Sequence, residues 1–190
     1  EGFAPLHWAA LGGHKDVATF LVESRADVTR ADSQGRTTLM NACANGHAEV
    51  ASLLVPLSAV DAKDVNMWTA LHFAANDGQK ECVELLCDNG CDVNLQDLDQ
   101  CTAMQYAAAN GHVGVGDVLL KSECNPKVTD KDGWMSLTYA ANDGHLEAVE
   151  YLANVLLQRG SDLKELVDVD GCTPLHHAAA NGHLAVVESL

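Results

Sequence analysis

Basic residues are scarce in this sequence, and long apolar runs are missing. Its 190 residues include 11 Lys and Arg against 27 Asp and Glu, which gives a formal net charge of -16. Nucleic-acid phosphates and anionic lipid headgroups both need a positive patch, so this balance predicts neither as a partner. No apolar run approaches the roughly 18 residues of a membrane-spanning helix. The charge therefore favours a protein or peptide partner that is neutral to basic.

Motifs that would support catalysis or metal binding are also missing. The sequence has no Gly-x-Ser-x-Gly turn, no phosphate-binding loop and no Cys-x-x-Cys pair. The segment 130–133 resembles the start of a calcium loop, but its glycine comes too early and Ala141 occupies the position of the required acidic ligand. We therefore expect no enzymatic activity, no bound metal and no cofactor.

An odd number of cysteines argues against a disulfide framework. The seven are Cys43, Cys82, Cys87, Cys91, Cys101, Cys124 and Cys172. Together with the opening Glu1-Gly2-Phe3, which has neither the basic segment nor the apolar stretch of a signal peptide, they favour reduced thiols inside the cell. We place the protein in the cytoplasm first and the nucleus second, and we expect Cys101 and Cys172 to be the more exposed thiols.

A repeat of about 33 residues organises the whole chain. Glycines recur at positions 13, 46, 78, 111, 144 and 182, with spacings of 33, 32, 33, 33 and 38, and histidine follows all but Gly78. Thr173-Pro174-Leu175-His176 corresponds to 69–72, and 91–94 corresponds to 26–29. This period with a Thr-Pro-Leu-His-x-Ala core resembles the ankyrin repeat family.

The residues account for the pattern physically. We count positions from the leading aspartate of a repeat, so Asp64 is position 1 and Gly78 is position 15. Thr at position 6 can cap a first helix, Pro suits position 7, and Gly at position 15 ends that helix. In the third repeat, Leu71 and the small residues Ala74 and Ala75 form one helix face, which lets neighbouring repeats approach closely. Apolar positions 19, 20, 22 and 23 predict a second helix.

The resemblance implies an all-α solenoid of stacked helix-turn-helix pairs with hairpin-like finger loops between them. We expect a single domain over 1–190, divided into repeats 1–31 (partial), 32–63, 64–96, 97–129, 130–167 and 168–190 (partial). Because the last repeat stops within its second helix, we also expect this chain to be a piece of a longer array.

Several departures from the pattern carry further expectations. Non-glycine residues occupy turn positions that favour positive φ, namely Arg25, Met67, Gln100 and Glu123. Gly114 and Gly116 fall inside a second helix and should soften the fourth repeat. The fifth repeat is 38 residues long, and 154–158 reads as about one extra helical turn. The recurring histidines predict structural hydrogen bonds to the backbone.

Aromatic residues make up only 5% of the chain, yet most of them share two positions. Phe20 and Tyr151 lie in the predicted core stripe, whereas the others occupy position 5 of the finger or position 10 of the first helix, which we expect to face solvent. In ankyrin-like proteins these variable positions line the groove that holds partners. The predicted partner-binding residues are Phe3, Trp8, Arg36, Asn41, Trp68, Phe73, Asp77, Asp99, Tyr106, Asp132, Trp134, Tyr139, Asp143 and His177.

Two functions fit these observations, and a third fits poorly. The first is a non-catalytic scaffold or adaptor, a monomer that binds partners through its groove and fingers. The second is a regulatory or substrate-recruiting domain of a larger enzyme, such as a kinase or a ubiquitin ligase. A self-contained enzyme would need a nucleophile and base at a recognisable spacing, which we do not find. The aromatic row has a purely structural interpretation as well, in which the rings only pack on one another.

Overall fold

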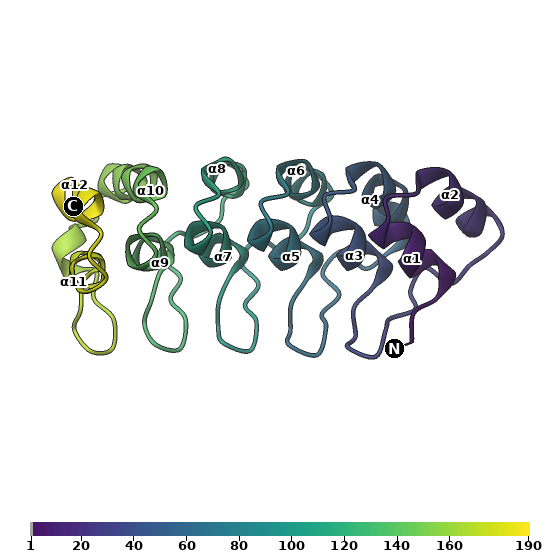
Figure 1. Ribbon diagram of the computed structural model, residues 1–190, viewed down its shortest axis with the longest axis horizontal. Helices are drawn as coiled ribbons and strands as arrows, with labels where there is room; N and C mark the ends of the chain where they lie inside the picture. Colours follow the sequence, from purple (N-terminus) through teal and green to yellow (C-terminus); the bar gives the residue numbers. More distant parts are fainter. Residues whose placement is uncertain (1) are drawn as a thin grey trace.

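The computed structural model describes residues 2–190 as a row of helix pairs joined by extended loops (Figure 1). The first helices are α1 (Pro5–Leu11), α3 (Thr38–Ala44), α5 (Ala70–Asn76), α7 (Ala103–Ala109), α9 (Ser136–Asn142) and α11 (Pro174–Ala180). The second helices are α2 (Lys15–Glu23), α4 (Ala48–Leu54), α6 (Lys80–Asp88), α8 (Val113–Lys121), α10 (Leu146–Gln158) and α12 (Leu184–Ser189). Two short 3-10 helices, Val55–Leu57 and Leu163–Glu165, follow α4 and α10. The expected all-α solenoid is confirmed for this part of the chain.

The first helices begin where the sequence predicts. The hydroxyls of Thr37 and Thr69 accept hydrogen bonds from backbone N–H groups three residues later, at 3.3 and 3.4 Å. Pro5 and Pro174 occupy the first turns of α1 and α11, where no backbone donor is needed. The threonine caps and prolines thus fix the starts of these short helices.

The Gly-His turn between the two helices of a pair also joins neighbouring repeats. Gly78 has a positive φ of 71°, and a Cβ atom added to it would lie 2.7 Å from the ring of His112 in the next repeat. The Nε2 atom of His112 in turn bonds the carbonyl oxygen of Asn76 at 3.0 Å. The same bond recurs from His47, His145 and His183 to the preceding repeat, as predicted for the recurring histidines.

The core lies between successive first helices and beneath the second helices. Leu71, Ala74 and Ala75 are buried, and so are Cys82 and Leu86 of α6. The alanines keep the first helices close together, as the sequence predicts. Helix α10 has 13 residues against nine in α6 and α8, so the extra turn in the fifth repeat is also confirmed.

The fingers are hairpin-like loops that project below the first helices (Figure 1). Bridges between Ala31 and Thr37 and between Gln96 and Thr102 close two of them. Each interior finger contacts the next through one backbone hydrogen bond, for example from the Val65 N–H to the Gln34 carbonyl at 2.9 Å. The fingers therefore form a continuous ledge beside the first helices.

Backbone strain occurs at the four predicted turn positions. Arg25, Met67, Gln100 and Glu123 have φ values of 62°, 65°, 63° and 65°, the left-handed region that normally favours glycine. These are the positive φ values at non-glycine residues in the described chain. The repeat architecture thus imposes its turn geometry even where the side chain opposes it.

One core prediction is wrong. Phe20, in α2, is 67% exposed, whereas Tyr151 at the same position of α10 is partly buried and donates a hydrogen bond to Asp117 at 3.1 Å. The difference arises because position 22 packs on the preceding repeat, and no described repeat precedes α2. None of the helices within 2–190 has the length and apolar character needed to cross a membrane.

Candidate functional site

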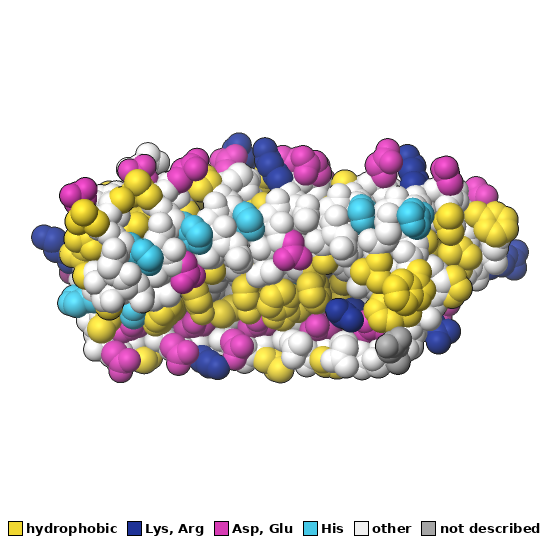
Figure 2. Space-filling model, in the orientation of Figure 1, with side chains coloured by type: hydrophobic (Ala, Val, Ile, Leu, Met, Phe, Trp, Pro, Cys, Tyr) yellow, Lys and Arg dark blue, Asp and Glu magenta, His cyan; other side chains and the backbone are white. Residues whose placement is uncertain are grey.

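The aromatic side chains gather on one side of the solenoid, in the angle between the first helices and the fingers. Figure 2 shows hydrophobic side chains forming a band there, above finger tips that carry carboxylates. We call this surface the aromatic face. Its members at positions 5 and 10 are Phe3, Trp8, Arg36, Trp68, Phe73, Tyr106, Trp134, Tyr139, Cys172 and His177.

The rings of the aromatic face form three packed groups. Trp68 lies 5.0 Å from Phe73 in its own repeat and 4.5 Å from Tyr106 in the next, measured between ring centroids. Trp134 is placed in the same way, 5.2 Å from Tyr139 and 4.4 Å from His177. Rings from adjacent repeats therefore pack side by side in both groups.

The third ring group lies at the N-terminal end, where Phe3 packs on Trp8 at 5.1 Å. Trp8 is 59% exposed, and it alone among the position-10 side chains faces solvent as fully as the sequence analysis expected. Phe73, Tyr106 and Tyr139 are half-buried. They lie against the finger tryptophans, so each presents one part of its ring to solvent and uses the rest for packing.

Asn41 does not belong to the accessible surface. It was predicted as a partner-binding residue because it occupies position 10 of α3, but only 4% of it is exposed. Its side chain is the shortest of the six at this position, so the tightly packed neighbouring helices cover it. Its amide Nδ2 atom makes no hydrogen bond within the described chain.

Two tyrosines of the aromatic face are anchored to leading aspartates. The hydroxyl of Tyr106 donates to Asp97 Oδ2 at 2.6 Å, and that of Tyr139 donates to Asp130 Oδ2 at 2.5 Å. Burial and these hydrogen bonds raise the pKa of both tyrosines. Both rings therefore stay neutral, with fixed orientations. These bonds were not predicted from the sequence, although a spacing of nine residues between Asp and Tyr recurs in both repeats.

Four predicted partner-binding aspartates, which we call the acidic flank, are exposed but partly paired: Asp77, Asp99, Asp132 and Asp143. Asp77 and Asp143 accept hydrogen bonds from adjacent asparagines at 2.8 Å. Asp99 forms an ion pair of 2.6 Å with Lys131 of the next finger, which raises the pKa of that lysine. Asp132 lies exposed at a finger tip. The flank remains net acidic, and a basic partner would have to compete with Lys131 for Asp99.

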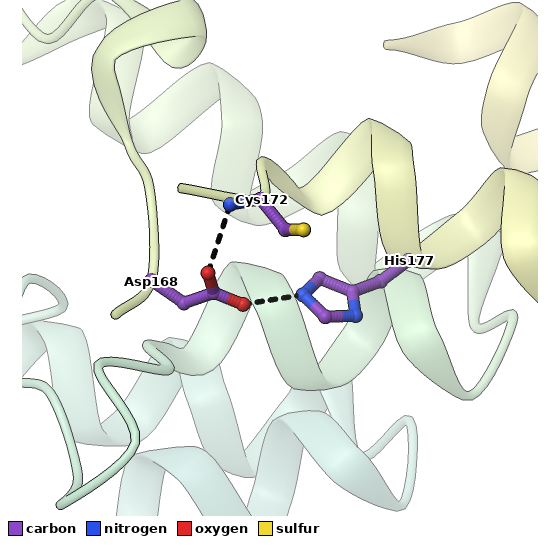
Figure 3. A group of neighbouring side chains, drawn as sticks. All are labelled: Asp168, Cys172 and His177. Atoms are coloured by element: carbon purple, nitrogen blue, oxygen red, sulfur yellow. Dashed lines mark hydrogen bonds and ion pairs between the residues drawn. The ribbon is translucent and has the colours of Figure 1, made fainter. Parts of the chain in front are cut away.

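One group of side chains offers three metal-ligand atoms. Within the described residues, the ligand atoms of Asp168, Cys172 and His177 all lie within 4.8 Å of one another (Figure 3). Asp168 Oδ2 lies 2.8 Å from His177 Nε2, and Asp168 Oδ1 accepts a hydrogen bond from the Cys172 N–H at 2.8 Å. Burial alone would raise the pKa of the Asp168 carboxyl. These two hydrogen bonds, together with one from the Asp170 N–H at 3.0 Å, outweigh burial and hold the pKa below its usual value.

The repeat architecture explains this group without a metal. His177 and Asp168 occupy the positions of Tyr106 and Asp97, which form the equivalent bond although tyrosine is a rare zinc ligand. The proximity of His177 and Cys172 could not be predicted from the sequence, because positions 1, 5 and 10 meet only once the finger folds back. The group therefore extends the aromatic face into the last repeat.

The structure corrects one of the two thiol predictions. Cys101 is buried, not exposed, and burial raises its pKa to about 11, while its sulfur lies 3.4 Å from the Tyr139 hydroxyl. Cys172 is half-buried. Cys87 on α6 was not predicted to be reactive, yet the neighbouring Cys91 and Ser122 lower its pKa to about 7, despite the opposing effect of burial. Cys87 therefore loses its thiol proton more readily than Cys101.

Known proteins match this chain through its repeats. A family model described as ankyrin repeats (3 copies) matches residues 39–130 and 104–190, and one described as ankyrin repeats (many copies) matches residues 6–55. A probable E3 ubiquitin-protein ligase of Oryza sativa subsp. japonica is 46% identical over 85 residues, which make up 44% of this chain and 16% of that protein. A tyrosine-protein kinase of Hydra vulgaris is 33% identical over 89 residues, or 45% of this chain and 12% of the kinase.

A human cation channel, transient receptor potential subfamily A member 1, is 34% identical over 88 residues, 45% of this chain and 8% of the channel. The matched segment thus spans less than a fifth of each of these relatives, whose names describe different activities. What they share with this chain is the repeat, and ankyrin repeats are protein-binding units. With family matches that run from residue 6 to residue 190, the chain belongs to the ankyrin repeat family.

Proposed function

We propose that this chain is a non-catalytic protein-interaction module whose partner binds the aromatic face. The observation that carries the proposal is the row of half-buried rings, in which Trp68 and Trp134 each pack on a ring of the following repeat. Aromatic side chains held in fixed orientations are typical anchors of protein interfaces, because they bury large areas at a small cost in conformational entropy. The acidic flank favours a neutral to basic partner and disfavours nucleic acid and anionic membranes.

The purely structural interpretation explains less of the surface. Packing alone would account for the contacts of Trp68 with Phe73 and Tyr106, but these rings remain partly accessible beside exposed carboxylates. Trp8 is 59% exposed in the same row. Apolar rings bordered by charged side chains favour an interaction surface over a closed core. We further infer that the module acts as a monomer inside the cell, where its seven free thiols stay reduced.

A second candidate function rests on the relatives. The 46% identical segment of the rice protein lies in a probable E3 ubiquitin-protein ligase, and another relative is a tyrosine-protein kinase. The array would then recruit substrates to, or regulate, an enzyme whose catalytic part lies elsewhere. Both candidates use the same surface, so they differ in the identity of the protein that carries the array and not in the mode of binding.

The test compares the immobilised array with two variants in quantitative affinity capture from cell extract. Trp68→Ala removes the central ring of the aromatic face, whereas Glu84→Lys reverses an exposed charge on α6, away from that face. We expect partners that bind the wild type and Glu84→Lys equally and are lost with Trp68→Ala. The expected loss is at least about 2 kcal/mol of binding free energy, as for an interface hot spot.

Circular dichroism and urea unfolding must first show that Trp68→Ala remains folded at the capture temperature. If this variant captures the same proteins as the wild type, partners use another face of the solenoid. If it unfolds, the rings serve the fold, and the proposal for this surface fails.

A further inference from the structure

The leading aspartates of the repeats build the fingers in one common way. Oδ1 of Asp64 accepts hydrogen bonds from the backbone N–H groups of Asn66 and Trp68, both at 2.8 Å. Corresponding pairs of bonds hold the other finger turns, at Asp32, Asp97, Asp130 and Asp168. One oxygen of every leading carboxylate is therefore committed to its own finger.

The second oxygen, Oδ2, accepts a side-chain donor in four of these five repeats. The donors are Arg36 Nε at 2.9 Å for Asp32, the Tyr106 hydroxyl for Asp97, the Tyr139 hydroxyl for Asp130 and His177 Nε2 for Asp168. Asp64 is the exception, because its Oδ2 has no hydrogen-bond partner among residues 2–190. Yet Asp64 is only 8% exposed. Its Oδ2 atom is not fully buried, so this oxygen reaches solvent.

The missing donor is a single hydroxyl group. Phe73 occupies the position at which Tyr139 donates to Asp130, and its ring is held in the same way. Phe73 lies 5.0 Å from Trp68 at an interplanar angle of 60°, whereas Tyr139 lies 5.2 Å from Trp134 at 65°. The ring is therefore in place, but the atom that would satisfy Asp64 is not.

A groove at the surface leads to this carboxylate. It lies between the second and third fingers and is lined by Gln34, Arg36, Asp64, Asn66, Trp68 and Phe73. Its positive charge, Arg36, is already bound to Asp32. The three ionised groups therefore leave one net negative charge beside two aromatic rings. A carboxylate attracts a cationic donor more strongly than a neutral one, and a cation also interacts favourably with the ring faces.

We propose that this groove is a specificity pocket for one basic side chain, Lys or Arg, of a bound protein segment. The cationic head would donate to Asp64 Oδ2, and the aliphatic part would lie against Trp68 and Phe73. The proposal rests on the proposed function, since it assigns one partner residue to one point of the aromatic face. It also gives a role to Asp64, whose Oδ2 atom has no side-chain donor, unlike the leading aspartates of the other four repeats.

The test uses defined peptides and a variant that supplies the donor from within the chain. The probes are the acetylated, amidated pentapeptide Gly-Ser-Arg-Ser-Gly and its citrulline analogue, which has nearly the same shape without the charge. Binding is followed by amide and indole chemical shifts of the 15N-labelled array. We expect the arginine peptide to shift signals of Asn66 and Trp68, and the citrulline peptide to bind about tenfold more weakly, the effect of one charge-assisted hydrogen bond.

Phe73→Tyr is the decisive variant. Its hydroxyl should bond Asp64 as Tyr139 bonds Asp130, so the urea midpoint should rise while the arginine peptide loses about tenfold in affinity. A loss of binding in a more stable protein cannot come from misfolding. Equal binding of both peptides, or unchanged binding to Phe73→Tyr, would overturn the pocket.

The outcomes also separate this proposal from the broader one. If both peptides shift signals around Trp134 and His177 but not around Trp68, the aromatic face still binds peptides and only the pocket is refuted. If neither peptide shifts any signal of the aromatic face, the pocket is refuted. The proposal that partners bind this face is then tested by the capture experiment alone.

Discussion

His72 and Gln105 perform the same structural task with different chemistry. His72 Nδ1 accepts from the Thr69 N–H at 3.2 Å, and its Nε2 lies 3.3 Å from the Cys101 carbonyl of the next finger. Gln105 accepts from the Thr102 N–H at 2.7 Å and donates to the Trp134 carbonyl at 2.8 Å. Only the histidine can be protonated in the range of physiological pH, and burial lowers its pKa.

This difference predicts that the free energy of unfolding depends on pH through His72. Because the folded-state pKa of His72 lies below its unfolded value of about 6.5, the unfolded chain binds more protons, and stability falls as the pH drops below that value. His72→Gln should keep both hydrogen bonds and lose this dependence. Between pH 7 and pH 5, the wild type should lose more unfolding free energy than the variant. Urea unfolding at both pH values measures this, and parallel losses would contradict it.

Some features of individual side chains could be predicted from the sequence, and others could not. The caps at Thr37 and Thr69 and the strained turns at Met67 and Gln100 follow from local chemistry, and they were predicted correctly. The burial of Asn41 was not, because it depends on how closely the helices on either side approach a short side chain. The same holds for Cys101, which is covered by a ring of the following repeat.

Helix α8 has a low intrinsic helix propensity, because it contains Gly114 and Gly116. Gly116 borders a small cavity between α7, α8 and α10, and a Cβ atom there would meet Met104 of α7 at 3.5 Å, an ordinary contact. Gly114 is exposed, and a Cβ atom would meet only Lys80 at 3.6 Å. Both sites therefore accept alanine without a clash.

Alanine at either site should stabilise the array. Gly114→Ala should add about 0.5–1 kcal/mol through helix propensity alone. Gly116→Ala should add slightly more, because its methyl group also fills part of the cavity. Urea unfolding gives the free energies, and amide hydrogen exchange should slow in α8 specifically. A destabilised Gly116→Ala protein would show that the close approach of Met104 requires glycine.

The elements themselves follow closely from the repeat pattern. The position of every first helix, the Gly-His turns and the extra turn of α10 were all predictable, because each depends on residues within one repeat. Contacts between separate elements were harder to predict from the sequence. Asp97 and Tyr106 belong to a finger and a helix, and their bond exists only because the finger folds back along its own repeat.

Across the whole molecule, the repeated positions 5 and 10 together form the aromatic face. Each repeat contributes one position-5 and one position-10 side chain, and stacking lines them up along the ledge of fingers (Figures 1 and 2). The exposed Phe20 and the half-buried tyrosines show the limit of this reasoning. Position within a repeat predicts which face a side chain occupies, whereas its exposure depends on the neighbouring repeat. Similarly, the missing donor to Asp64 Oδ2 can be recognised only from the side-chain contacts of all the leading aspartates.

The most direct test of the central claim, that partners bind the aromatic face, is hydrogen–deuterium exchange of the array with and without a captured partner. We predict slower exchange in the fingers 64–69, 97–102 and 130–135 and in α5, α7 and α9. The backbone of α6 and α8, on the opposite side of each pair, should exchange at unchanged rates. Protection confined to the second helices, with the fingers unaffected, would contradict the account.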